Sequence, residues 1–264
     1  MSLRDDATEC RSCGALDAVL AFSGQLLSHR VDFFECRTCR YVQTERPFWL
    51  EQPYSTVMND SDTGVMSRNL TNARIVLGTL WMLGALPAKV VDFAGGYGVL
   101  VRLLRDYGVD AFWVDRYCTN LMARGFEYDC GQAGLLTAFE ALEHFVAPGE
   151  ELAHMLSIAP TVLLSTELMP VPTPAQQDWW YYGSEHGQHI GFFRVETLRA
   201  LASRHGKRLL TDGRAYHLVT DHAVNETAWR LMLRLNRAIP ALVRGKLTSR
   251  TWSDHELMAS RPQK

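Results

Sequence analysis

The chain has 264 residues, 47% of them hydrophobic, and a formal net charge of −2. This length suits one large domain with a small attachment, or two modest domains, with enough apolar residues for a full core. The balanced charge gives no electrostatic case for a nucleic-acid partner, and no apolar stretch approaches the roughly 18 residues that a membrane span requires. The N-terminus lacks the pattern of a secretory signal, so we expect a cytoplasmic protein whose thiols stay reduced.

Four of the six cysteines lie in the first forty residues as two Cys-x2-Cys pairs, Cys10 with Cys13 and Cys36 with Cys39. Apolar runs between the pairs predict short strands at 19–22 and 31–34. Two such turns can share one tetrahedral ion through their thiolates, which predicts a zinc ribbon over residues 1–46. Because four sulfur ligands leave no open position, we expect this Zn²⁺ to be structural.

Residues 47–87 follow as a polar, aromatic linker and a helical lid, with a helix predicted at 70–83 from apolar residues at helical spacing. From residue 88 to the C-terminus, short apolar strands alternate with helices, which predicts an α/β fold with a mostly parallel, doubly wound sheet and a C-terminal helical extension. The strands are predicted at 89–93, 111–114, 134–139, 161–165 and 208–210, with 215–219 pairing with the last. The helices are predicted at 99–107, 148–158 and 195–205.

The first of these strands runs into the sequence Val-Val-Asp-Phe-Ala-Gly-Gly-Tyr-Gly at 90–98. Glycines let the backbone approach a ligand closely, and the following helix offers free N–H groups at its N-terminus. Asp92 stands directly before the turn. Asp115 ends the second strand, 17 residues after Gly98, where an acidic side chain can accept hydrogen bonds from ribose hydroxyls. These residues predict a nucleotide-like ligand.

The turn resembles the first motif of the class I S-adenosylmethionine methyltransferases, acidic-x-Gly-x-Gly-x-Gly, and residues 139–144 resemble their Glu-x-Leu-Glu-His segment. This resemblance implies a Rossmann-like domain that binds S-adenosylmethionine. The cofactor-binding residues that it implies are Asp92, Ala94, Gly96, Gly98, Asp115, Phe139, Glu140 and His144. Ala94 departs from the motif, because it stands where the motif has its first glycine. Its methyl group disfavours a positive-φ turn. The Gly-x-Gly-x-x-Gly pattern of NAD(P) enzymes is absent.

Residues 178–193 contain six aromatic residues, two histidines and three glycines. This composition predicts a loop over a pocket, with rings as walls and a histidine as acid or base. A buried aromatic core with surface histidines is the alternative. The candidate substrate-contacting residues are Arg68, Trp179, Trp180, Tyr181, Tyr182 and Gln188. The candidate catalytic residues are His189, His186 and Tyr54.

The layout of residues 10–217 resembles bacterial methyltransferase-domain proteins with an N-terminal four-cysteine ribbon, and more distantly the deoxysugar C-methyltransferases. The catalytic Glu-His pair of the second group would fall on Gln188 and His189. This resemblance implies in-line methyl transfer to a small molecule, such as a sugar or an intermediate of glycan or secondary metabolism, with His189 as general base. Gln188 departs from the pattern, because an amide cannot titrate.

Two other functions stay open from the sequence. One is an RNA base methyltransferase with a zinc module. The arginines at 11, 30, 37, 40 and 46 favour it, whereas the balanced charge and the missing Asn/Asp-Pro-Pro-Tyr/Phe motif oppose it. The other is a non-catalytic scaffold that binds S-adenosylmethionine, which Ala94 and Gln188 would favour. The substrate, the methylated atom and the oligomeric state are not determined by the sequence.

Overall fold

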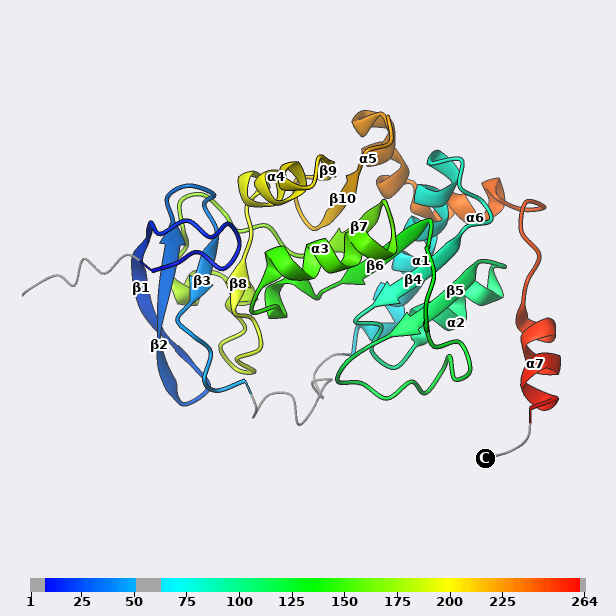
Figure 1. Cartoon of the computed structure of the whole chain (residues 1–264), viewed down its shortest axis with the longest axis horizontal. Coiled ribbons are helices and arrows are strands. Elements are labelled where there is room, and N and C mark those ends of the chain that lie inside the picture. The colour runs from blue at the N-terminus through cyan, green and yellow to red at the C-terminus, as the bar shows by residue number, and fades with distance from the viewer. Residues whose placement is uncertain (1–7, 51–62, 262–264) are drawn as a thin grey trace, which may run out of the picture. The chain divides into compact units, whose positions relative to one another are not determined.

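The computed structural model describes residues 8–50 and 63–261. Its strands are β1 (Ala18–Leu26), β2 (His29–Cys36), β3 (Val42–Thr44), β4 (Lys89–Phe93), β5 (Asp110–Val114), β6 (Leu135–Phe139), β7 (Val162–Ser165), β8 (Gly191–Phe192), β9 (Arg208–Thr211) and β10 (Tyr216–Thr220) (Figure 1). Its α-helices are α1 (Val65–Met82), α2 (Val99–Asp106), α3 (Pro148–Ile158), α4 (Val195–Arg204), α5 (Glu226–Arg234), α6 (Ile239–Leu242) and α7 (Thr251–Ala259). Within the described ranges, no helix combines the length and the apolar character that crossing a membrane requires.

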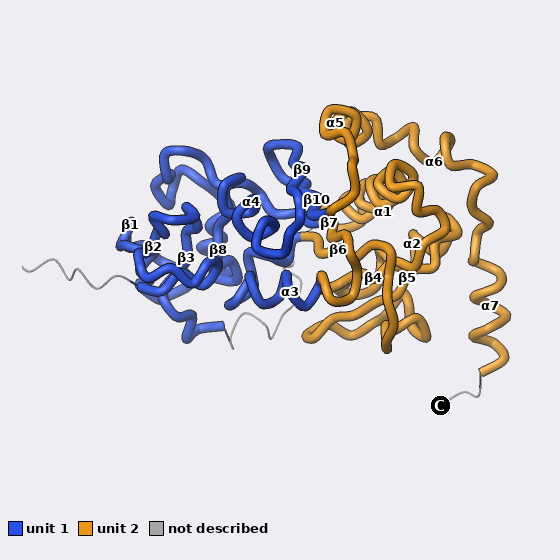
Figure 2. The backbone as a smooth tube through the Cα atoms, turned by 45° about the horizontal axis from the view of Figure 1, so that its top comes forward, with its two compact units in different colours: residues 1–59, 140–155, 164–220 blue, residues 60–139, 156–163, 221–264 orange. Residues whose placement is uncertain are grey.

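The chain forms two compact units, each assembled from segments that are distant in sequence (Figure 2). Unit 1 comprises residues 1–59, 140–155 and 164–220, and unit 2 comprises residues 60–139, 156–163 and 221–264. The ribbon, the lid and the larger domain expected from the sequence are consecutive segments. The compact units are not consecutive, because residues 140–155 and 164–220 pack with residues 1–59 to form unit 1.

The strands form two sheets, with hydrogen-bonded orders β1-β2-β3-β8 and β5-β4-β6-β7-β10-β9. In the six-stranded sheet, β4 pairs in parallel with both β5 and β6. The edge strand β9 pairs antiparallel with β10. Each strand predicted beyond residue 88 is present within one residue of its expected bounds, and the pairing of the last two is confirmed. The protein therefore has the α/β fold with a mainly parallel sheet that the sequence predicts.

The small sheet of unit 1 is completed by a strand that the sequence pattern did not reveal. The hairpin β1–β2 is antiparallel, β3 pairs with β2, and the two-residue β8 pairs with β3 through Val42 opposite Phe192 and Gln43 opposite Gly191. Two residues are too few to show the alternation of a strand. The side chains beneath this sheet form an aromatic and aliphatic core that includes Phe33, Trp179 and Phe192.

Helix α1 begins at Val65, five residues before the predicted start at residue 70. Arg68 and Asn69 therefore belong to the helix and not to a linker. The first two turns carry few buried side chains, whereas buried residues run from Asn72 to Leu80. The prediction started late because apolar spacing marks only the part of a helix that packs against a core.

One buried ion pair anchors helix α7 within unit 2. Arg105 of α2 donates to both carboxylate oxygens of Asp254, from Nε at 2.7 Å and from Nη2 at 2.8 Å. Its Nη1 donates to the Ala111 carbonyl at 3.0 Å, and its guanidinium lies 3.7 Å from the Phe126 ring centroid. Asp254 is the buried residue of α7. Asp254 also pairs with Arg102 at 3.0 Å, and Arg105 with Asp110 at 3.1 Å. The Asp254 charge is therefore paired only while α7 stays in place.

We predict that Asp254→Ala releases α7. Arg105 then loses both bonds to Asp254 and keeps only Asp110, 3.1 Å away, as a counter-ion. We therefore expect a cost of about 3 kcal/mol, the lower end of the range for breaking a buried ion pair. Backbone amides of residues 251–259 should then exchange with solvent on the order of 100-fold faster, measured by hydrogen exchange with mass spectrometry. Glu256→Ala, an exposed change on the same helix, is the control and should leave the exchange rates unchanged. Equal protection in both variants would contradict this role.

Candidate functional site

The glycine turn after β4 is joined to the end of β5 by three hydrogen bonds within unit 2, one of them from the Gly95 N–H to the Val114 carbonyl at 3.2 Å. The Gly96 backbone N–H donates to Asp115 Oδ2 at 2.9 Å, and the Trp113 indole N–H donates to the Gly96 carbonyl at 2.8 Å. The second Asp115 oxygen accepts from the backbone N–H groups of Tyr117 and Cys118 at 2.7 and 2.8 Å. The structure thus brings together the turn and the acidic residue that the sequence predicted as parts of one site.

The backbone of the turn has positive φ at Ala94 (57°), Gly96 (53°) and Gly98 (84°). Ala94 occupies the left-handed region although it carries a Cβ, at a cost of about 1–2 kcal/mol. Gly98 is required for a second reason, because a Cβ there would lie 2.7 Å from Asn120 Oδ1. The backbone therefore adopts a positive-φ turn even though alanine replaces the first glycine of the motif.

Asp92, at the end of β4, is a buried carboxyl group beside this turn. It accepts a hydrogen bond from the Thr137 hydroxyl at 2.7 Å. Burial raises the pKa of Asp92 to about 7, the Thr137 hydrogen bond opposes that rise, and the negative charge of Asp115 adds to it. A cationic ligand at the turn would favour the charged form of this carboxyl group.

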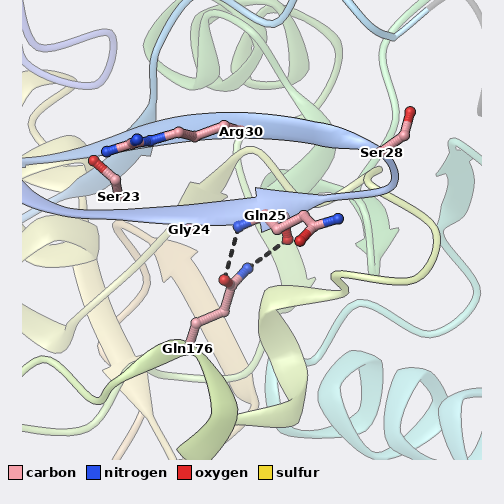
Figure 3. Close-up of a pocket in the computed structure, with 6 residues that line it drawn as sticks. All are labelled: Ser23, Gly24, Gln25, Ser28, Arg30 and Gln176. Atoms are coloured by element: carbon pink, nitrogen blue, oxygen red, sulfur yellow. Dashed lines mark hydrogen bonds between the residues drawn. The ribbon is translucent and has the colours of Figure 1, made fainter.

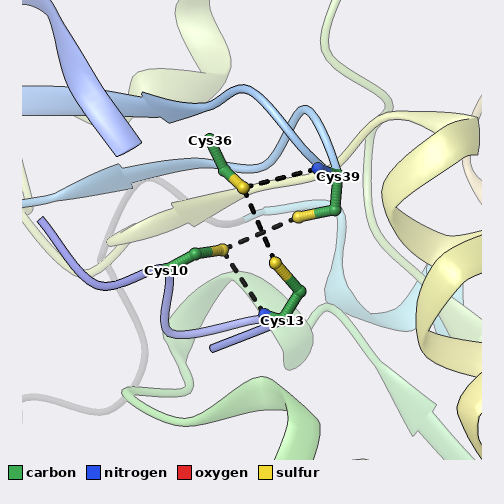
Figure 4. A group of neighbouring side chains, drawn as sticks. All are labelled: Cys10, Cys13, Cys36 and Cys39. Atoms are coloured by element: carbon green, nitrogen blue, oxygen red, sulfur yellow. Dashed lines mark hydrogen bonds between the residues drawn. The ribbon is translucent and has the colours of Figure 1, made fainter. Parts of the chain in front are cut away.

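The four cysteines of the predicted ribbon converge in unit 1, with their sulfur atoms all within 4.8 Å of one another (Figure 4). Cys10 Sγ lies 3.6 Å from Cys39 Sγ, and Cys13 Sγ lies 3.6 Å from Cys36 Sγ. Four thiolates about 2.3 Å from a tetrahedral Zn²⁺ would be separated by roughly 3.8 Å, whereas disulfide sulfurs lie at about 2.05 Å. The spacing fits a shared zinc ion and not disulfides.

Helix α4 holds both cysteine turns through their backbone carbonyls. The Thr197 hydroxyl donates to the Cys39 carbonyl at 2.8 Å, and Arg204 donates to the carbonyls of Ser12 and Cys13 at 3.1 and 2.5 Å. The Cys13 N–H and the Cys39 N–H also point at the sulfurs of the first cysteine of their own pairs, at 3.4 and 3.3 Å. These hydrogen bonds fix the backbone of both cysteine turns.

The segment 178–193 is mostly buried. Trp179, Tyr182 and Phe192 belong to the core of unit 1, so the buried-core alternative describes these three side chains. Trp180 is 76% exposed and is available to a ligand. That alternative also placed the two histidines on the surface, and this part is wrong. His189 is 9% exposed and His186 is half-buried.

Tyr181 connects this segment to two glutamates that follow β6. Its hydroxyl donates to Glu143 Oε1 at 2.7 Å and lies 3.4 Å from Glu140 Oε2. Glu140 has a positive φ of 49°, and its Oε1 accepts from the Ser165 hydroxyl at 2.5 Å. Burial, and then repulsion from Glu140, raises the pKa of Glu143 to about 8. Glu143 lies in the Glu-x-Leu-Glu-His segment but is not among the predicted site residues, since its burial depends on residues almost forty positions away.

His189 lies among two other histidines and Tyr181 within the same unit. The His189 ring lies 4.9 Å from that of His144, 4.7 Å from that of His186 and 4.6 Å from that of Tyr181, between centroids. Burial lowers the pKa of His189 well below its usual value and that of His144 to about 4. Burial also lowers the pKa of His186. All three rings are therefore neutral near pH 7 and carry a lone pair.

The remaining predicted site residues have varied surroundings. Phe139 ends β6 in unit 2, whereas Glu140 and His144 belong to the cluster of unit 1. Arg68 is exposed on α1, and Gln188 is half-buried, with its backbone N–H donating to His186 Nδ1 at 3.1 Å. Tyr54 lies outside the described residues.

A polar depression lies beside the β1–β2 hairpin, lined by Ser23, Gly24, Gln25, Ser28, Arg30 and Gln176 (Figure 3). Gln176 takes the place of a neighbouring strand there: its Oε1 accepts from the Gln25 N–H at 2.8 Å, and its Nε2 donates to the Gln25 carbonyl at 2.7 Å. These bonds satisfy backbone groups of β1. The polar residues of the depression thus have a structural role in pairing the edge of β1.

Comparison with solved structures finds several methyltransferases at low identity. An O-methyltransferase family protein from Burkholderia thailandensis is 17% identical with a TM-score of 0.44, covering 64% of this chain and 62% of that one. Magnesium protoporphyrin IX methyltransferase from Synechocystis, with bound SAH, is 16% identical with a TM-score of 0.46, covering 65% and 93%. Human N-acetylserotonin methyltransferase, in complex with SAM, is 15% identical with a TM-score of 0.41, covering 57% and 51%. This chain thus spans less than two thirds of the first of these structures.

No curated protein matches the sequence. The family model described as "Methyltransferase domain" matches residues 69–211, which is more than half of the chain. That match includes the glycine turn, Asp115 and the cluster around Tyr181. The chain belongs to the methyltransferase domain family.

Proposed function

We propose that the protein is an S-adenosylmethionine-dependent methyltransferase that acts on a small molecule. The observation that carries this proposal is the hydrogen bond from the Gly96 N–H to Asp115, which joins a positive-φ turn at a helix N-terminus to an acidic residue. The turn would hold the methionine part of the cofactor, and Asp115 would hold its ribose. Asp92 and Phe139 are the other proposed cofactor contacts in unit 2.

We predict that the protein binds S-adenosylmethionine and S-adenosylhomocysteine, and that Asp115→Ala weakens both. Hydrogen bonds to a charged group contribute about 1.5–3 kcal/mol, so Kd measured by isothermal titration calorimetry should rise at least tenfold. Asp129→Ala, a change at an exposed position of the same unit, should leave Kd unchanged. The absence of binding by the unaltered chain would disprove the cofactor assignment.

Unit 1 would handle the methyl acceptor. The carbonyl oxygen of Tyr181 can only accept, so His189 Nδ1, 2.6 Å away, carries the proton, and Nε2 carries the lone pair. We infer that this lone pair takes part in removing the acceptor's proton, directly or through a group bound to it, with His186 as the second candidate. Trp180, Tyr181 and Gln188 are the proposed acceptor contacts. Glu140 and His144, which the sequence predicts as cofactor contacts, are proposed as acceptor contacts instead, because they belong to the cluster around Tyr181.

We predict that His189→Asn abolishes turnover and leaves cofactor binding intact. Asparagine can still donate to the Tyr181 carbonyl but lacks the atom at the Nε2 position. The release of S-adenosylhomocysteine, assayed with a panel of nucleotide-activated sugars, should fall about 10² to 10⁴-fold. His255→Gln, at an exposed position of α7, is the control. Full activity in His189→Asn would exclude a role of that nitrogen in the reaction.

The cysteine cluster is proposed to hold a structural zinc ion. Zinc bound by four thiolates stabilises small modules by on the order of 10 kcal/mol. We predict that Co²⁺ added to the metal-free chain gives the charge-transfer absorption of thiolate coordination, and that Cys39→Ser removes most of it. Cys130→Ser, at an exposed cysteine outside the cluster, should retain the absorption. Equal spectra for the two variants would show that the cluster does not bind the metal.

The RNA methyltransferase alternative depends on basic side chains of the ribbon. Arg11 is not available for that role, because its Nη2 donates to the carbonyls of Thr44 and Ile190 at 3.1 and 2.8 Å. Arg40 pairs with Glu35 at 2.7 Å. These contacts favour a small-molecule acceptor. The scaffold alternative would require cofactor binding without turnover. The calorimetry above measures the binding, and the assay with the panel of sugars measures the turnover.

A further inference from the structure

The histidine and glutamate side chains beside Tyr181 form a second set of metal-ligand type, separate from the cysteines. One ligand atom each from Glu143, His144 and His189 lies within 4.8 Å of the others. Glu143 and His144 are consecutive in a short 3-10 turn after β6, and His189 precedes β8. All three belong to unit 1.

Each of the three residues has a coordinating atom to offer. Glu143 Oε2 and His144 Nδ1 are buried and have no hydrogen-bond partner. His189 carries its lone pair on Nε2, because its Nδ1–H is donated to the Tyr181 carbonyl. A buried polar atom without a partner costs about 1–3 kcal/mol, so two such atoms in one cluster indicate that a ligand binds there.

A second polar atom of each side chain is hydrogen bonded to the protein, as is common for side chains that bind metals. The Tyr181 hydroxyl donates to Glu143 Oε1 at 2.7 Å, which leaves Oε2 as the free oxygen. His144 is hydrogen bonded to the backbone of Gln188, and His189 to that of Tyr181. Histidines that bind metals commonly donate their other ring N–H to a carbonyl or carboxylate, which orients the ring.

We propose that Glu143, His144 and His189 bind one divalent transition-metal ion. Two imidazoles and a carboxylate suit Zn²⁺, Mn²⁺ or Fe²⁺, and three protein ligands leave at least one position open. The site therefore resembles an open site for reactions, in contrast to the closed set of four thiolates.

This inference goes beyond the proposed function, because metal binding can be measured without a methyl donor or acceptor. If both proposals hold, the ion occupies Nε2 of His189, and an oxygen of the acceptor takes the open position. Cofactor binding by unit 2 and metal binding by this cluster are measured separately. The failure of one proposal is thereby distinguished from the failure of the other.

The test is a count of zinc per chain. The full-length protein is equilibrated with Zn²⁺, dialysed, and analysed by inductively coupled plasma mass spectrometry. We expect two zinc ions in the unaltered chain and one in Glu143→Gln, His144→Gln and His189→Asn. These variants keep the hydrogen bonds on the far side of each residue, and circular dichroism checks that they fold.

Controls separate the two zinc sites. Cys39→Ser should also hold one zinc, and the double variant of Cys39→Ser with His189→Asn should hold none. His255→Gln, which removes an exposed histidine, should hold two. One zinc in the unaltered chain that is lost in Cys39→Ser, or two zinc ions in each of the cluster variants, would overturn the proposal.

Discussion

The pairing of β8 with β3 is the interaction on which unit 1 depends. Two residue pairs and the bond from the Thr44 N–H to the Ile190 carbonyl, 3.1 Å long, join the N-terminal sheet to a strand almost 150 residues later. Gly191 is required there, because the Tyr41 side chain occupies the place that a Cβ would take. The pairing fixes both flanks of β8. His189 enters the polar cluster before it, and Arg194 after it donates to Glu35 at 2.8 Å.

The chemistry proposed for unit 1 follows from the burial of polar atoms that have no hydrogen-bond partner in the protein. Tyr181 satisfies one oxygen of Glu143, and backbone groups hold the rings of His144 and His189 on one side only. Folding thereby removes from water a carboxylate oxygen and an imidazole nitrogen that receive no protein partner. An arrangement of this kind costs stability unless a ligand completes it. Both proposals use the lone pair of His189 Nε2, which accepts a proton when the metal is absent and is occupied by the ion when the metal is bound. The two proposals therefore concern one site in two states.

The cofactor turn of unit 2 is determined by shorter-range interactions. Its strand, its glycines and Asp115 lie within 30 residues, and local pattern was enough to predict all of them. The structure adds the reason why Ala94 is tolerated at positive φ: the neighbouring Gly96 is held through both its N–H and its carbonyl. These hydrogen bonds to the end of β5 hold the turn that contains Ala94 in place.

The sequence by itself determined the strands after residue 88 apart from β8, the glycine turn and the cysteine pairs. Each of these depends on residue spacing within a short segment. The sequence could not determine that Arg11 is a buried donor, that Trp179 and Tyr182 are core residues, or that Glu143 faces His189. Burial and side-chain partners come from segments far apart in the chain, and only the tertiary structure decides which of them meet. The sequence therefore indicated the methyl donor, and the fold supplied the polar cluster that we propose for the acceptor.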